Sequence, residues 1–334
     1  MGLPERIWYG THSLKWVLAP LSLLFAAISA LRRLLFRLGL KRVERLPVPV
    51  IVVGNLTAGG TGKTPLTVYL ARELARLGYR PGIVSRGYGG KAVGAAAVYP
   101  DSDPAQVGDE PVLLARAAGV PVFVCRDRAA AGRALLAAHP DIDVLLCDDG
   151  LQHYRLGRDL QLCVVDGARG FGNGWLLPAG PLREPVSRLA EVDAVIVNGG
   201  DAQPAHPRVF RMMLAPGACY RLDDPAITRA AGDFSGGELA AVCGIGNPAR
   251  FFATLEALGL TFSRHAFADH HAYAADELPR GVIITTEKDA VKLAARAEII
   301  ADGARIWVLP VNATLSPDLG GWLATRLKNG RKAA

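Results

Sequence analysis

A glycine-rich segment between an apolar run and a Lys-Thr pair has the residue types that bind nucleotide phosphates. The apolar run covers residues 50–53, the loop covers 54–62, and Lys63 and Thr64 follow. In a P-loop of this kind the backbone N–H groups surround phosphate oxygens. The lysine reaches the β- and γ-phosphates, and the threonine hydroxyl binds Mg²⁺. Pro65 and the apolar spacing after it predict that a helix starts at this point.

The loop departs from the standard P-loop pattern at one position. That pattern has glycine six positions before the lysine, where this chain has Thr57. The alternative interpretation is a glycine-rich surface turn. Such a turn would account for the Gly-Lys-Thr sequence by itself, but not for a strand, a glycine-rich loop and a helix predicted in this order. The predicted phosphate-binding residues are Thr57, Ala58, Gly59, Gly60, Thr61, Gly62, Lys63 and Thr64.

Two adjacent carboxylates follow a second apolar run. Asp148 and Asp149 come directly after residues 144–147, as expected of the acid that organises Mg²⁺ beside a P-loop. Adjacent carboxylates repel each other unless a cation lies near them, although a solvated Asp-Asp turn is the alternative. His153 lies close in sequence, and its role is left open between structural and catalytic.

Two further segments contain acidic residues, and their spacing favours different roles. Asp109 and Glu110 follow Gly108, and spacing alone favours Asp109 as a helix N-cap with no chemical role. Asp269-His270-His271 lies in an expected loop, where an Asp-His pair suits proton transfer. The same segment resembles a metal cluster, but no Cys or Glu at zinc-site spacing accompanies it.

Four arginines are the expected anion binders outside the N-terminal segment. A planar guanidinium suits phosphate, both in recognition and in stabilising charge during transfer. Each could instead form a surface ion pair. The four are Arg86, Arg126, Arg128 and Arg183, the last in the rigid loop 176–185.

The elements that must position these residues alternate between apolar strands and helical stretches. Near-continuous aliphatic strands of this kind indicate a parallel sheet that is covered on both faces. We expect an α/β fold with a P-loop NTPase-type sheet domain, a smaller second α/β domain and an N-terminal membrane-associated helix. The expected divisions are 1–45 (anchor), 46–207 (P-loop domain), 208–327 (second domain) and 328–334 (frayed tail).

The basic charge of the chain is concentrated at the N-terminus. The 334 residues carry a net charge of +7, and residues 1–45 have eight basic and two acidic side chains. Residues 16–31 are uncharged, but Pro20 interrupts them and a membrane-spanning helix needs roughly 20 residues. An apolar stretch with a cationic flank is typical of an interfacial anchor on an anionic leaflet, and a buried core helix is the alternative.

Composition narrows the class of protein further. Half of the residues are hydrophobic, which excludes global disorder and provides a large core. The five cysteines form no CxxC pair and no secretory cleavage signal is apparent, so a reduced cytosolic setting fits best.

Taken together, the motifs resemble the tetraacyldisaccharide 4′-kinase family of membrane-associated lipid A kinases. They occur in the family's order over almost the whole chain, and Thr57 is itself the family's form. The matching segments are 53–65, Ser85-Arg86-Gly87-Tyr88-Gly89-Gly90, Gly108-Asp109-Glu110-Pro111, Asp148-Asp149-Gly150-Leu151-Gln152-His153, 177–184, Asp269-His270 and Thr286-Glu287-Lys288-Asp289-Ala290-Val291-Lys292.

The resemblance implies an activity and a location. Members use ATP and Mg²⁺ to phosphorylate the 4′-hydroxyl of a tetraacylated glucosamine disaccharide 1-phosphate, which gives lipid IVA. They work at the cytoplasmic face of the bacterial inner membrane. The partners implied are this lipid A precursor and the membrane surface, with no nucleic acid and no protein partner.

The resemblance also implies roles for individual residues. An aspartate and a histidine that act together on the attacking hydroxyl fall on Asp109 and His270, which replaces the N-cap interpretation of Asp109. His270 is preferred to His271 because it directly follows Asp269. Lys63 and Arg183 complete the expected catalytic set, with Arg183 near the transferred phosphate. The expected metal ligands are Thr64, Asp148, Asp149 and Glu110.

Three other classes of protein fit the sequence less well. A membrane-associated P-loop ATPase that positions proteins would usually carry a second lysine where this chain has Ala58. A GTPase would usually show Asn-Lys-x-Asp, and the nearest candidate, residues 198–201, lacks the lysine. A basic nucleic-acid binder is disfavoured because the charge adjoins an apolar anchor and no aromatic platform accompanies it.

Overall fold

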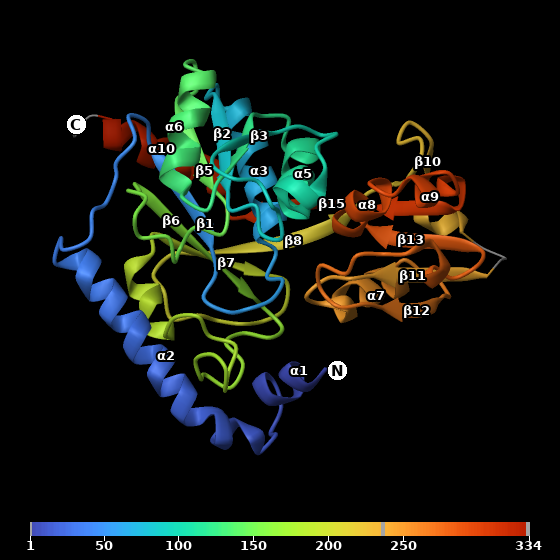
Figure 1. Cartoon of the computed structure of the whole chain (residues 1–334), viewed down its shortest axis with the longest axis horizontal. Helices are drawn as coiled ribbons and strands as arrows, with labels where there is room; N and C mark the ends of the chain where they lie inside the picture. The colour runs from blue at the N-terminus through green and yellow to red at the C-terminus, as the bar shows by residue number, and fades with distance from the viewer. Residues whose placement is uncertain (1, 235–237, 332–334) are drawn as a thin grey trace.

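Two α/β units make up most of the molecule. The computed structural model describes residues 2–234 and 238–331. The first unit contains a nine-stranded sheet with the P-loop, and the second contains a six-stranded sheet. Figure 1 shows the two units side by side, joined through β8 and β15, with α2 along the outside of the first unit. The expected fold class is confirmed.

The first sheet has the order β15-β8-β7-β6-β1-β5-β2-β4-β3. Neighbours are parallel except for β3 against β4 and β15 against β8. The P-loop strand β1 lies between β5 and β6, so the loop after β1 faces the carboxyl end of β5. The strands are β1 (Val50–Gly54), β2 (Pro81–Ser85), β3 (Ala96–Val98), β4 (Val122–Val124), β5 (Val144–Cys147), β6 (Leu160–Asp166), β7 (Ala194–Asn198), β8 (Val209–Pro216) and β15 (Val311–Ser316).

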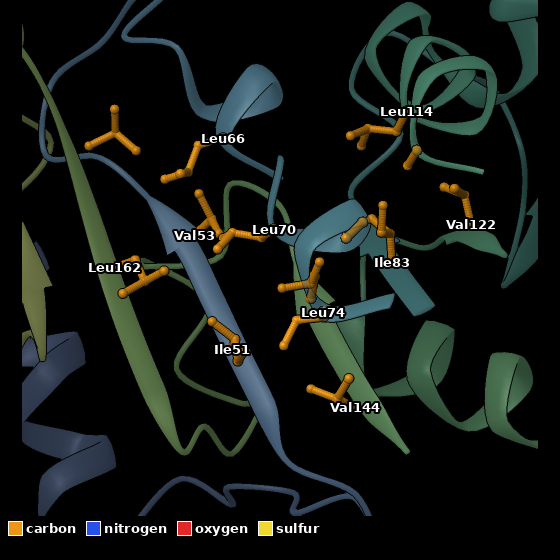
Figure 2. Close-up of a cluster of buried hydrophobic side chains, with 14 of the residues drawn as sticks. Ile51, Val53, Leu66, Leu70, Leu74, Ile83, Leu114, Val122, Val144 and Leu162 are labelled. Atoms are coloured by element: carbon orange, nitrogen blue, oxygen red, sulfur yellow. The ribbon is translucent and has the colours of Figure 1, made fainter. Parts of the chain in front are cut away.

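Helices cover both faces of this sheet. On one face α3 (Lys63–Arg76), α5 (Asp109–Ala118) and α10 (Leu319–Arg331) enclose one core. Figure 2 shows Leu66, Leu70 and Leu74 of α3 directed toward β1, as their spacing of four predicts. The other face packs on α6 (Arg128–Ala138) and the 3₁₀ helix η1 (Val186–Glu191). A short helix α4 (Pro104–Val107) precedes α5.

The second unit has the sheet order β10-β9-β14-β13-β11-β12. Four of its strands, β14, β13, β11 and β12, are parallel to one another. Two separate clusters of buried apolar side chains form the core of this unit. The elements are β9 (Cys219–Arg221), β10 (Thr228–Arg229), η2 (Ala231–Asp233), β11 (Leu239–Cys243), α7 (Pro248–Ala257), β12 (Ser263–Ala266), η3 (Ala275–Glu277), β13 (Val282–Thr286), α8 (Glu287–Ala294), α9 (Ala297–Ile300), η4 (Gly303–Arg305) and β14 (Ile306–Leu309).

The boundary between the units differs from the sequence-based division at 208 and 327. Strand β8 extends the first sheet, and β15 returns to pair with it in the register Val311↔Pro216. Helix α10 then packs against α3, so residues 217–310 form the second unit. Residues 328–331, placed in the expected tail, continue α10, while 332–334 lie outside the described residues. A pairing between strands almost a hundred residues apart leaves no local signal in the sequence.

The N-terminal segment forms α1 (Leu3–Trp8) and the long helix α2 (Leu14–Arg37). Pro20 lies inside α2, which continues on both sides of it, so the expected interruption is absent from this helix. Proline costs the helix one backbone N–H donor. One face docks on the first unit through the Ser22 hydroxyl, which donates to the Leu176 carbonyl over 2.8 Å.

The opposite face of α2 presents apolar side chains that the protein does not cover. By length and composition α2 could cross a membrane. The most exposed of these side chains include Trp16, Val17, Leu21, Leu23, Leu24 and Leu31.

Candidate active site

A cavity of about 1440 Å³ connects the P-loop with both units and with α2. Its volume exceeds that of a typical site for one small ligand, so it has room for two substrates. Its lining includes residues 59–65, Asp149 and Arg183 from the first unit and Asp269, His270 and Lys288 from the second. Phe25, Ile28 and Arg32 of α2 also line it.

The P-loop connects the buried strand β1 with α3, whose first residue is Lys63. The Lys63 Nζ atom lies 3.4 Å from the Asn55 Oδ1 atom and 3.6 Å from the Asp149 Oδ1 atom. The Asn198 side-chain amide donates to the Thr61 carbonyl over 2.9 Å and so holds the loop from the adjacent part of the sheet. The Thr61 hydroxyl is buried and has no protein partner among the described residues, as expected of a group that meets a phosphate.

The loop that contains Arg183 lies against the P-loop. The Ala58 amide donates to the Pro181 carbonyl over 2.7 Å, and the Arg183 amide donates to the Leu56 carbonyl over 2.6 Å. The Arg183 guanidinium lies 3.1 Å from the Asp149 carboxylate. The Arg183 guanidinium and the Lys63 ammonium group therefore contact the same carboxylate beside the phosphate-binding loop.

Asp148 and Asp149 have contrasting surroundings. Burial, together with Glu110 and Asp149, raises the pKa of Asp148 to about 7. Asp149 is half-buried; burial alone would raise its pKa, but Lys63 and Arg183 hold the pKa below the ordinary value. Asp149 has a φ of 46°, in the left-handed region where non-glycine residues are uncommon and often functional.

The surroundings of Asp148 fit a magnesium ion. Its Oδ1 atom accepts the Thr67 hydroxyl over 2.9 Å, and its Oδ2 atom is buried with no protein partner within the described chain. An unpaired carboxylate oxygen at the end of β5 is a suitable oxygen ligand for a hard cation. Among the described residues no group of three or more His, Cys, Asp or Glu side chains could enclose a metal. Phosphate oxygens and water would therefore have to complete the coordination.

Glu110, one of the expected metal ligands, is held by the second unit. The Lys288 Nζ atom lies 3.0 Å from the Glu110 Oε1 atom and 3.0 Å from the Asp269 Oδ1 atom. In this geometry the Glu110 carboxylate joins the two units. Sequence reasoning assigned no role to Lys288, although it lies in the quoted segment 286–292.

Asp109 and His270 meet across the cleft between the units. The His270 Nδ1 atom lies 3.0 Å from the Asp109 Oδ2 atom and 3.1 Å from Oδ1. His271 faces away and contacts Glu277 over 3.0 Å. Asp109 is the first residue of α5 after the N-cap Gly108, so it is not the N-cap that spacing alone favoured. His270 has a φ of 62°, and its ring packs on Tyr88, which sequence reasoning quoted without a role.

The charges around Asp109 keep it ionised. Asp109 is 6% exposed, and burial alone would raise its pKa. The hydrogen bond from His270 and the charge of Lys288 outweigh burial, so the pKa lies below its ordinary value. The same hydrogen bond raises the pKa of His270 against the effect of its own burial. Asp109 is therefore deprotonated, which a proton acceptor requires, and His270 fixes the orientation of its carboxylate.

The remaining candidate residues lie elsewhere in the cavity. Arg86 and Arg126 are exposed on its wall, whereas Arg128 is buried and donates to the Asp149 carbonyl over 3.2 Å. The His153 Nε2 atom accepts the Arg128 amide over 3.3 Å. Burial and the nearby Arg128 lower the pKa of His153 to about 4. Its contacts are thus with the start of α6, not with Asp109.

Comparison with known proteins gives a consistent result. Residues 14–328 match the family described as Tetraacyldisaccharide-1-P 4′-kinase. The chain is similar to the Tetraacyldisaccharide 4′-kinase of Chromobacterium violaceum, at 56% identity over 336 residues that cover 98% of each chain. It is also similar to that of Dechloromonas aromatica (strain RCB), at 53% identity over 339 residues, 99% of this chain and 98% of the relative.

A solved structure has the same fold. The crystal structure of "apo" form LpxK from Aquifex aeolicus in complex with ATP matches with a TM-score of 0.78 at 30% identity. The match covers 94% of this chain and 99% of the other.

The geometry predicts a sensitive position in the P-loop. Gly62 has a φ of 96°, and a Cβ atom there would lie 2.2 Å from the Asn198 Nδ2 atom. We expect Gly62→Ala to displace the loop and to weaken Mg-ATP binding by at least about 10-fold, measured by isothermal titration calorimetry.

Gly78→Ala is the matched control. Gly78 has a φ of 86°, but a Cβ atom there meets nothing within 4 Å, so the control carries similar backbone strain without a clash. Equal nucleotide affinity in the two variants would contradict this account of the P-loop.

Proposed function

The chain belongs to the tetraacyldisaccharide-1-phosphate 4′-kinase family, and on this premise we propose the reaction it performs. It transfers the γ-phosphoryl group of ATP to the 4′-hydroxyl of a tetraacylated glucosamine disaccharide 1-phosphate. The product is lipid IVA, in lipid A biosynthesis. Binding of ATP in the related crystal structure supports ATP as the donor.

The observation that carries the proposal is the position of the Asp109–His270 pair. His270 lines the same cavity as the P-loop, and Asp109 lies directly behind its ring, 3.0 Å from the His270 Nδ1 atom. A phosphate-binding loop alone would serve many ATPases. A buried, ionised carboxylate beside it suits a hydroxyl acceptor, whose proton has to be removed.

Asp109 acts as the proton acceptor in the transfer. The sugar oxygen forms a bond to the γ-phosphorus as the bond from that phosphorus to the β,γ-bridging oxygen breaks, and ADP leaves. The hydroxyl proton passes to an Asp109 carboxylate oxygen. His270 orients that carboxylate from across the cleft, and Lys288 adds positive charge near it. Because His270 belongs to the second unit, closure of the units should accompany ATP binding.

The P-loop residues stabilise the phosphates during transfer. Lys63 and Arg183 approach the site from two directions, and both contact the Asp149 carboxylate. Asp148 and Thr64 would hold Mg²⁺, with Asp149 as a further ligand. When bound, the ion neutralises charge on the β- and γ-phosphates.

Helix α2 brings the acceptor to the cavity. Phe25, Ile28 and Arg32 face the cavity, while other apolar side chains of the helix face outward. An apolar wall with a cationic end suits an acylated, phosphorylated sugar, with Arg86 and Arg126 available for its 1-phosphate. The chain therefore works on the cytoplasmic face of the inner membrane, held there by its N-terminal helix.

A direct assay distinguishes a lipid kinase from a membrane-associated P-loop ATPase. The full chain is incubated with γ-labelled ATP, Mg²⁺ and the disaccharide 1-phosphate lipid, and products are separated by chromatography. We expect a labelled bis-phosphorylated lipid. Rapid ATP hydrolysis with no labelled lipid would support the ATPase instead.

Replacing Asp109 tests the proton acceptor. In the same assay we expect Asp109→Asn to lower kcat by about 10² to 10⁴, because the amide cannot take up the proton. The KM for ATP should change little, since the P-loop contacts remain. Asp101→Asn, at an exposed aspartate in the turn between β3 and α4, is the control. A kcat equal to that of the unmodified chain would remove Asp109 from the mechanism.

Charged substitutions on the outer face of α2 test membrane binding. Leu24 and Leu31 are 58% and 57% exposed, and burying one leucine contributes about 1.5–3 kcal/mol. We expect Leu24→Glu with Leu31→Glu to lower binding to phosphatidylglycerol-containing vesicles by at least about 10-fold in sedimentation.

Val93→Glu is the control for this experiment, because Val93 is 99% exposed and lies outside the N-terminal segment. If the α2 variant sediments with vesicles as fully as the control, α2 is not the anchor. Circular dichroism checks that each variant is folded.

A further inference from the structure

Arg169 contacts two segments that are far from it and from each other in sequence. It lies in the turn after β6, and one guanidinium nitrogen donates to the Gly246 carbonyl of the second unit over 3.0 Å. Another lies 3.0 Å from the Glu5 carboxylate of α1. The guanidinium also packs over the ring of Tyr9 at 5.2 Å. The planar fork of arginine can hold two partners in different directions at once.

The Gly246 contact matters because Gly246 lies against the P-loop. A Cβ atom added to Gly246 would lie 2.6 Å from the Gly60 amide nitrogen, so the two backbones are packed closely together. Both residues line the cavity. The loop from β11 to α7 therefore covers the phosphate-binding segment, and the position of Gly246 affects how tightly the site closes.

Asp166 fixes the geometry around Arg169. It is 2% exposed and accepts the amides of Ala168 and Arg169 over 3.0 and 3.1 Å. It also lies 2.7 Å from the Arg250 guanidinium at the start of α7. The turn that carries Arg169 is thus tied to the second unit independently of α1.

Helix α1 is docked on the same region of the first unit. The Trp8 indole donates to the Pro178 carbonyl over 2.9 Å, and the Asn173 amide donates to the Trp8 carbonyl over 2.8 Å. A short segment then leads from α1 into α2, the proposed membrane anchor. Movement of the anchor can therefore reach Glu5, and through Arg169 the Gly246 carbonyl.

We propose that Arg169 is a positioning residue that couples the N-terminal membrane segment to closure of the second unit over the P-loop. This inference rests on the proposed function for the anchor and the nucleotide site. When α2 is docked on a lipid surface, α1 and Glu5 are held in place, Arg169 is oriented, and the 244–247 loop stays on the P-loop. Nucleotide then binds more tightly.

The test is the affinity of the full chain for Mg-ATP, measured by calorimetry with and without phosphatidylethanolamine–phosphatidylglycerol vesicles. We expect vesicles to tighten binding to the unmodified chain. Arg169→Gln should weaken binding by about 10-fold or more with vesicles present, as expected for loss of a charged hydrogen bond. Arg169→Lys should recover part of this affinity, because one ammonium group can reach one of the two partners.

Glu5→Gln separates coupling from a purely local role. It removes the ion pair with α1 but leaves the Arg169–Gly246 contact in place. We expect this variant to sediment with vesicles normally and yet to show the same ATP affinity with and without them. Arg296→Gln, which loses only an exposed pair with Glu298, should behave as the unmodified chain.

Several outcomes would overturn the inference. Unchanged affinity in Arg169→Gln would remove the positioning role. A vesicle effect that is absent in the unmodified chain, or retained in Glu5→Gln, would remove the coupling. The titration contains no lipid acceptor, so a failure to phosphorylate the lipid would count against the proposed function and not against this inference.

Discussion

The contact between Asp109 and His270 is the interaction on which the rest of the site depends. One partner begins α5 in the first unit, and the other lies in a loop of the second unit, 3.0 Å away. Without His270 from the second unit, the Asp109 carboxylate of the first unit would lose the hydrogen bond that orients it and helps to keep its pKa low. The other features of the site can be understood as means of holding the two units in this relation.

Two groups of ion pairs between the units fix the position of the second unit against the first. On one side Lys288 bridges Glu110 and Asp269 beside the Asp109–His270 pair. On the other side Asp166 pairs with Arg250. The antiparallel pair β8 and β15 carries the chain into the second unit and back (Figure 1). A two-strand connection with contacts on both sides allows the units to close without losing their alignment.

The sequence predicted the parts that depend on local pattern. The aliphatic runs 50–53 and 144–147 located β1 and β5, and the helix expected after the glycine-rich loop is α3, which begins at Lys63. What it could not predict depends on distant pairing. The strand β15 is polar and alternating, and Lys288 meets Glu110 across 178 positions. Pro20 predicted an interruption of the N-terminal helix, because rules for proline in helices consider a segment in isolation. In the structure α2 continues through Pro20, and the Ser22 contacts hold the helix on the first unit. Only the family resemblance gave Asp109 a chemical role.

The most direct test of the composite site is a double-mutant cycle between Asp109 and His270, with kcat/KM for lipid phosphorylation as the readout. If the two residues act as one unit across the cleft, Asp109→Asn with His270→Ala should be little worse than the more damaging single substitution. Losses that simply add in free energy, with each substitution acting independently, would contradict the account.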